Sequence, residues 1–176
     1  VVFHSGSTFY HSVTYDSTAN KVVMAYHEGD SSYYGRINVG NVQPSDNSIT
    51  FAPTVVFNSS KTEDISVTYD STANKVVIAY QDTDNSQAGT AIVATVSGDS
   101  ITFGTPVVFN NTRTRTISSV YDPVATKVVV TYMDFVNSNR GTAVVGAVSG
   151  DSIAFGTPAV FTSGGLGYHS PTYDPA

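Results

Sequence analysis

Apolar residues along this chain fall in short runs that are separated by clusters of Gly, Pro, Asn, Asp and Ser. Residues 65–69 (ISVTY) alternate apolar and small polar side chains, whereas residues 76–80 (VVIAY) are apolar throughout. Alternation with a period of two predicts a half-buried strand, and a short apolar run rich in β-branched residues predicts a strand covered on both faces. No long window has apolar residues at helical spacing, so the pattern predicts an all-β chain.

The pattern recurs at a nearly constant interval. Residues 12–23 read SVTYDSTANKVV, residues 66–77 read the same letters, and related copies begin at Ser118 and Ser170. A Tyr-Asp pair marks each copy, and the tyrosines are spaced by 54, 52 and 52 residues: Tyr15-Asp16, Tyr69-Asp70, Tyr121-Asp122 and Tyr173-Asp174. The chain is therefore a tandem repeat of about 52 residues.

Each repeat is predicted to contain four strands. In the second copy these strands are residues 65–69, 76–80, 90–96 and 101–109, and residues 110–116 connect them to the next copy. The last strand carries Pro106; Pro158 occupies the matching position and Pro53 lies one residue off it. Proline cannot donate a hydrogen bond to a sheet, so this strand is predicted to be an outer edge.

Four antiparallel strands per repeat of this length resemble the blades of β-propeller proteins. The phrases YDSTANKVV and GTAxVxxVSGDSIxFGTPxVF are also similar to repeats of phage, viral and bacterial surface proteins, without matching a characterised family. The resemblance implies three complete blades at residues 11–57, 65–109 and 117–161. Residues 1–10 would be the last strand and connector of a preceding blade, and residues 169–176 the start of a following one.

The alternative fold is an open array of β-hairpin units or a β-sandwich. Propellers typically close with four to eight blades, so three blades are expected to need further blades of a longer chain or other copies of this one.

Composition excludes several classes of partner. The net charge is −6 with no cluster of Lys and Arg, which argues against nucleic acid, and no apolar run is long enough for a membrane span. Cysteine is absent, which excludes disulfides and cysteine-based metal sites. Low charge with many Ser, Thr and Asn residues is typical of extracellular and virion-surface proteins, so we expect that location and no cofactor.

The loops differ in how strongly they vary between copies. The turn after the first strand reads DSTANK, DSTANK and DPVATK, whereas the connectors read HSGSTFYH, NSSKTEDI, NNTRTRTI and TSGGLGYH. A constant scaffold face opposite a variable loop face favours a binding module, with neutral drift as the alternative. The candidate ligand-binding residues on the variable face are Phe9, Tyr10, His11, Tyr33, Tyr34, Arg113, Arg115, Arg140, Tyr168 and His169.

Aromatic rings among polar neighbours suit the apolar face of a sugar, so a glycan is the expected ligand class, with a surface protein as the alternative partner. His11 and His169 align with Ile65 and Ile117, which favours a packing role for both histidines.

Two further kinds of site are weaker. Asp82 and Asp84 loosely resemble a calcium loop, but the sharp glycine and the distal glutamate are missing, so loop-capping carboxylates are favoured over a metal site. Asn58 and Asn110 each begin an Asn-x-Ser/Thr sequence, lie one repeat apart and are expected to be exposed, so they are candidates for glycosylation.

No nucleophile–base set and no inward pair of carboxylates recurs in the repeats, so the chain is predicted not to be an enzyme. The alternatives to a binding module are a purely structural repeat of a fibre, filament or virion, and part of a propeller glycoside hydrolase.

Overall fold

The chain folds entirely into antiparallel β-structure. The computed structural model describes residues 2–29 and 32–175, and within them it has thirteen strands in one open sheet and no helix. The strands are β1 (Thr8–Asp16), β2 (Lys21–Glu28), β3 (Tyr34–Gln43), β4 (Ser48–Phe51), β5 (Val55–Asp70), β6 (Lys75–Asp82), β7 (Ala88–Ser97), β8 (Ser100–Phe103), β9 (Val107–Asp122), β10 (Lys127–Asp134), β11 (Arg140–Ser149), β12 (Ser152–Phe155) and β13 (Ala159–Gly165). The all-β prediction is confirmed. The described residues form no helix that is long and apolar enough to cross a membrane.

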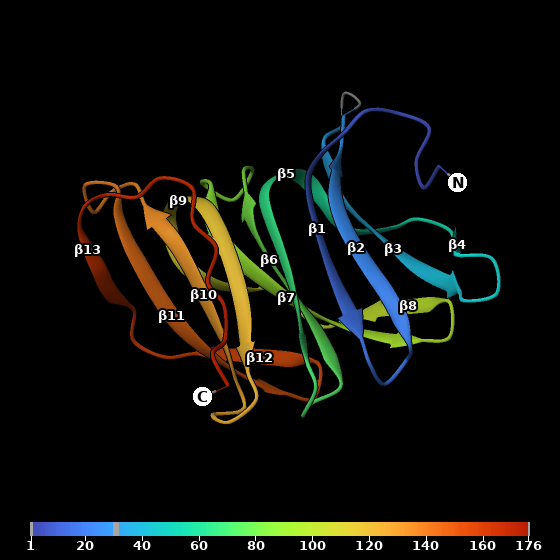
Figure 1. The fold of residues 1–176 in the computed structure, drawn as a ribbon. Helices are drawn as coiled ribbons and strands as arrows, with labels where there is room; N and C mark the ends of the chain where they lie inside the picture. The colour runs from blue at the N-terminus through green and yellow to red at the C-terminus, as the bar shows by residue number, and fades with distance from the viewer. Residues whose placement is uncertain (1, 30–31, 176) are drawn as a thin grey trace.

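Each repeat forms one set of paired strands, which we call units 1, 2 and 3. Unit 1 contains β1, β2 and β3, and its outer edge is β4 with the first part of β5. The second part of β5 begins unit 2, and β9 joins units 2 and 3 in the same way. Figure 1 shows the three units side by side, with the turns β1–β2, β5–β6 and β9–β10 at one end and the loops β6–β7 and β10–β11 at the other.

The outer edge differs from the predicted continuous strand. Residues 104–106 separate β8 from β9, although both strands pair with β7. Pro53, Pro106 and Pro158 all lie in this break, where a residue without an N–H group costs no hydrogen bond of the sheet. The predicted connectors, residues 58–64 and 110–116, are also not loops but extended parts of β5 and β9.

The predicted strands at the two ends are not formed. Residues 2–7 and 166–175 contain no strand, and Val1 and Ala176 lie outside the described residues. Neither segment has a neighbouring strand of its own unit to receive its N–H and C=O groups, which is the requirement for a stable strand.

The core lies between units rather than within one. The middle strand of unit 2 is buried along Val76–Tyr80, as the unbroken apolar run predicted. One cluster joins its side chains to unit 1 and a second joins them to unit 3. The tyrosines of the repeated Tyr-Asp pairs strengthen these contacts, because Tyr69 Oη donates to Thr18 Oγ1 at 2.7 Å and Tyr121 Oη donates to Thr72 Oγ1 at 2.6 Å.

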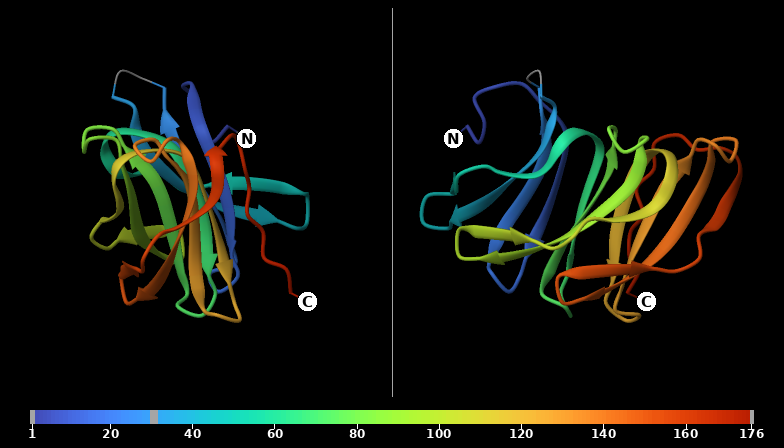
Figure 2. Two further views of the ribbon diagram at one scale, coloured as in Figure 1. Left: turned by 90° about the vertical axis from the view of Figure 1, so that its left-hand side faces the viewer. Right: turned by 180° about the vertical axis from the view of Figure 1, so that it is seen from behind.

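The outer hairpins also reach from one unit to the next. Hairpin β11–β12 extends over unit 2, and hairpin β7–β8 extends toward unit 1 (Figure 2). Ion pairs fix both hairpins: Lys75 Nζ lies 2.7 Å from Asp151 Oδ1, and Lys21 Nζ lies 3.3 Å from Asp99 Oδ1. Adjacent units are therefore held together at the turn end by polar contacts and along their length by the apolar clusters.

Candidate functional site

A pocket of about 220 Å³ opens where the first strands of the units approach one another at the loop end. Its walls come from two adjacent positions of the repeat, taken once from each of the four copies. The lining residues are Tyr10, His11, Asp64, Ile65, Thr116, Ile117, Tyr168 and His169. Their spacings are the repeat spacings of 54, 52 and 52 residues. The pocket is therefore a consequence of the tandem fold, and its chemistry is set by residues that vary between copies.

A backbone irregularity shapes this pocket in every unit. Tyr10, Asp64 and Thr116 have φ angles of 52°, 49° and 47°, in the left-handed region. The pairing register shifts at the same place in each unit, between Phe9 and Ser12 in unit 1 for example. A bulge of this kind re-aims a side chain, and a left-handed non-glycine residue costs about 1–3 kcal/mol. The strain recurs three times beside one cavity.

The middle strands of units 1 and 2 each fix the connector that leads to the next unit. Gln81 is fully buried and its Nε2 donates to Thr114 O, while the buried His27 Nδ1 lies 2.7 Å from Thr62 O. Met133 occupies this position in unit 3 and has no donor to offer. Tyr168, on the connector that follows unit 3, is fully exposed. The two internal connectors, which carry Asp64 and Thr116, are therefore held in place more firmly than the connector that carries Tyr168.

Charge in the pocket centres on Asp64. Burial raises the pKa of this carboxyl above its usual range and Glu63 adds to the effect, while a hydrogen bond from the Thr116 backbone and the charge of Arg115 oppose it. Burial likewise raises the pKa of Tyr10, with Glu63 and Asp64 nearby. The Thr116 hydroxyl is buried and has no hydrogen-bond partner among the described residues. The pocket thus offers a carboxyl and aromatic rings at short range, while the Thr116 hydroxyl lies buried behind its wall.

The two histidines of the pocket have different surroundings from the isoleucines that share their repeat position. Ile65 and Ile117 are buried, whereas His11 is exposed and lies 2.6 Å from Thr8 Oγ1 through Nε2. His169 is half-buried, and its Nε2 lies 2.7 Å from Thr131 Oγ1. Both imidazoles thus lie at the edge of the pocket, each in contact with a threonine hydroxyl.

An aromatic cluster continues from the pocket over unit 1. The rings of Phe9, Tyr10 and Tyr33 surround the buried His27, with centroid distances of 5.5, 5.5 and 5.2 Å. Lys61 Nζ lies 5.6 Å from the centre of the Tyr33 ring. Tyr10 therefore links the pocket to two further predicted residues, Phe9 and Tyr33.

The remaining predicted residues do not line the pocket. Tyr34 begins β3 and is half-buried. The Arg113 guanidinium lies 4.2 Å from the centre of the Phe135 ring, and Arg140 is exposed at the start of β11. Arg115 acts on the pocket only through its charge.

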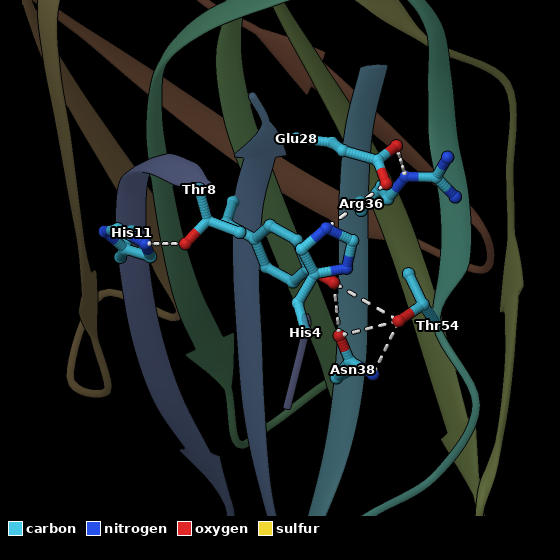
Figure 3. A network of polar contacts seen from close by, with 8 residues as sticks. His4, Thr8, His11, Glu28, Arg36, Asn38 and Thr54 are labelled. Carbon is cyan, nitrogen blue, oxygen red and sulfur yellow. Dashed lines mark hydrogen bonds and ion pairs between the residues drawn. The ribbon is translucent and has the colours of Figure 1, made fainter. Parts of the chain in front are cut away.

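A second polar network covers the outer side of unit 1 (Figure 3). Glu28 accepts a hydrogen bond from Arg36 Nε, and its other oxygen lies 3.3 Å from His4 Nε2. Beside it, Tyr26 Oη donates to Asn38 Oδ1 at 2.8 Å, and Asn38 Nδ2 donates to Ala52 O at 2.9 Å. Every one of these groups is satisfied within the protein, so the network attaches residue 4 to unit 1.

The weak metal candidates, Asp82 and Asp84, lie near the loop between β6 and β7. Asp84 is exposed and Asp82 is half-buried. The described residues contain no group of three or more His, Cys, Asp or Glu side chains arranged to hold a metal ion.

The glycosylation candidates, Asn58 and Asn110, lie within β5 and β9, where they are half-buried. Their Nδ2 atoms donate to Thr62 Oγ1 at 3.0 Å and Thr114 Oγ1 at 2.9 Å. A glycan at that nitrogen would replace this hydrogen bond.

Sequence reasoning placed Tyr10, His11, Tyr168 and His169 on one face, and the structure brings these four together. It missed Asp64 and Thr116, which occupy the position of Tyr10 in the next two copies and are found by adding the repeat spacing.

Comparison of the chain with known protein families, characterised proteins and solved structures finds no match. The site must therefore be interpreted from its own geometry.

Proposed function

We propose that the three units are successive blades of a β-propeller and that the chain is a non-enzymatic binding module. Its ligand is a carbohydrate, taken up in the pocket lined by the four repeat copies. The supporting observation is that a repeated scaffold forms one cavity whose lining residues differ between the repeat copies. Variable loop residues held on a rigid scaffold are typical of a binding site.

The chemistry of the lining supports a sugar as the ligand. Tyr10 and Tyr168 supply aromatic faces, while Asp64 supplies a hydrogen-bonding carboxyl group. Pockets for drug-sized ligands measure about 300–1,000 Å³. At about 220 Å³ this pocket suits the terminal residue of a glycan rather than an extended chain.

Two features favour binding over hydrolysis. Asp64 is the one carboxyl among the residues that line the pocket, whereas most glycosidases use two carboxyl groups on either side of the scissile bond. The histidines at the pocket edge contact threonine hydroxyls rather than a nucleophile paired with a carboxylate. The chain would act outside a cell or on a virion, where glycans are displayed.

A glycan array compared between the wild type and Asp64→Asn tests this proposal. Asparagine keeps the shape of the side chain at this left-handed position and replaces one acceptor oxygen by an amide group. A hydrogen bond to a charged group contributes about 1.5–3 kcal/mol, so the variant should bind roughly 13- to 160-fold more weakly. Asp84→Asn is the matched control, because Asp84 is exposed and lies outside the pocket. The wild type should bind a restricted set of glycans, and Asp84→Asn should bind them equally well. No glycan binding by the wild type, or equal binding by Asp64→Asn, would contradict the proposal and favour a purely structural repeat.

A further inference from the structure

The outer side of unit 1 exposes one half of an interface that the chain forms twice internally. We call it the leading face, represented by Val13 and Tyr15. In unit 2 the equivalent Val67 and Tyr69 are 6% and 8% exposed, because unit 1 packs on them. In unit 1 the same positions are 58% and 53% exposed. The difference lies in the missing neighbour, since the two strands share the sequence SVTYD.

The outer side of unit 3 exposes the other half, which we call the trailing face. Val93 and Phe109 of unit 2 are 1% and 7% exposed beneath unit 3. Their equivalents in unit 3, Val145 and Phe161, are 46% and 50% exposed. The leading and trailing faces are therefore complementary in shape to each other, as their buried counterparts demonstrate at two internal interfaces.

The polar contacts at the turn end complete this match. Each internal interface pairs a lysine of one unit with an aspartate in the outer hairpin of the next, as Lys75 does with Asp151. On unit 3 the equivalent lysine is Lys127, whose ammonium reaches only as far as the neighbouring backbone oxygen of Thr126, at 3.3 Å. On unit 1 the outer hairpin carries Asp46. Opposite charges thus stand at corresponding corners of the two exposed faces.

The sequence shows that unit 3 leads into a unit like unit 1. Ser5-Gly6 precedes β1 and Tyr10-His11 lies near its start, and the same pairs recur at the end of unit 3 as Ser163-Gly164, in β13, and Tyr168-His169, after it. The two internal connectors have neither pair. The kind of connector that enters unit 1 is therefore the kind that leaves unit 3.

The terminal segments already occupy places that a neighbouring unit would fill. The ring centroid of Phe3 lies 5.2 Å from that of Tyr26 and 5.8 Å from that of Phe51. Phe109 packs in the same way, with its ring centroid 5.2 Å from that of Tyr132 and 5.5 Å from that of Phe155. Phe161 is the equivalent of Phe3 on the trailing face. At the other end, His169 contacts Thr131 of β10, in the place that a following first strand would take. This last segment is unpaired, whereas β1 of another copy would bring its paired β2 with it.

We propose that two copies of this chain associate head to tail, with the trailing face of each on the leading face of the other, to close a ring of six units. Tyr10-His11 of the second copy would then replace Tyr168-His169 in the wall of the pocket, so that each pocket is completed by the partner. Six units lie within the usual range of four to eight blades. The inference rests on the propeller part of the proposed function and is independent of any ligand.

Sedimentation equilibrium of the full chain without carbohydrate tests the proposal. The wild type should be a dimer at micromolar concentration. Val13→Glu damages only the leading face and Val145→Glu only the trailing face, so each variant alone should be a monomer. An equal mixture retains one intact interface and should regain dimers. Val136→Glu, on an exposed loop residue with the same change of charge, should remain dimeric like the wild type.

Circular dichroism establishes that each variant is folded, which is expected because the substituted side chains are exposed. A monomeric wild type at high concentration would overturn the proposal. Dimerisation of either single variant would overturn it as well, since that result indicates pairing of like faces. Neither result would bear on glycan binding, which the array measures separately.

Discussion

Gly104 lies where units 2 and 3 pack so closely that there is no room for a side chain. A Cβ atom placed on this residue would lie 1.6 Å from the backbone oxygen of Asp151 in the outer hairpin of unit 3. The equivalent Gly156 of unit 3 has open space, with its nearest neighbour, Val145 O, at 3.7 Å. Both glycines donate the same backbone hydrogen bond of 2.9 Å to the neighbouring strand. Gly104→Ala and Gly156→Ala are therefore a matched pair that differ only in the contact between units.

The expected cost follows from how far the hairpin must move. Backbone atoms cannot rotate away, so the hairpin has to shift by at least 1.4 Å to bring the contact from 1.6 Å to 3.0 Å. Unit 1 shows that the fold tolerates such a shift, because Ala52 occupies this position there and its Lys21–Asp99 pair is longer, at 3.3 Å rather than 2.7 Å. We therefore expect the lower part of the range for overpacked interiors, about 1–2 kcal/mol. For a chain of this size that corresponds to a fall in Tm of roughly 2–8 °C.

Urea and thermal unfolding of the two variants provide the measurement. Gly156→Ala should be as stable as the wild type or gain up to about 1 kcal/mol from the reduced entropy of its unfolded chain. Equal stability of Gly104→Ala and Gly156→Ala would refute the close packing of the outer hairpin on unit 2.

Two further substitutions probe the pocket and its support. Asp64→Asn should raise Tm at pH 7. The folded protein raises the pKa of Asp64, so ionisation of this carboxyl destabilises the fold, and asparagine cannot ionise. The gain in Tm should vanish below about pH 4, where the carboxyl is protonated in both the folded and the unfolded state. Gln81→Met copies the residue that unit 3 has at this position and keeps the side-chain volume, but it leaves the Thr114 carbonyl without its buried donor. The free energy of unfolding in urea should fall by about 1–3 kcal/mol. An unchanged free energy of unfolding would show that the connector does not depend on this hydrogen bond.

The strands were predictable because their signal is local. Alternation over residues 65–69 and the apolar run over residues 76–80 both predict strands, and the structure contains strands at both places. The strand at residues 65–69 is not half-buried as its alternation predicted: all five residues are buried, because the neighbouring units cover its polar positions as well. The break at Pro106 was only partly predictable, since proline marks an edge without showing that the edge strand is interrupted. The extension of β5 and β9 through the connectors was missed, because residues 58–64 and 110–116 are polar and lack the alternation of a half-buried strand.

Only some of the residues that line the pocket could be predicted from the sequence. Exposed aromatic residues on the variable face pointed to Tyr10 and Tyr168. The left-handed conformation that helps to form the cavity could not be predicted from the sequence. Glycine is the residue that usually indicates this conformation, but here it is adopted by Tyr10, Asp64 and Thr116. Contacts between units, such as Lys75 with Asp151, join residues 76 positions apart and emerge only from the packing of whole units.

A nuclear magnetic resonance titration tests the central claim most directly, because it locates the ligand on the protein. Uniformly ¹⁵N-labelled protein would be titrated with the carbohydrate that binds best on the array, and amide shifts recorded. We expect the largest shifts at Tyr10, Asp64, Thr116 and Tyr168, which line one pocket from four copies of the repeat. Shifts confined to the turns at the opposite end, residues 70–75 and 97–100, or the absence of any shift, would contradict the assignment of the pocket as the binding site.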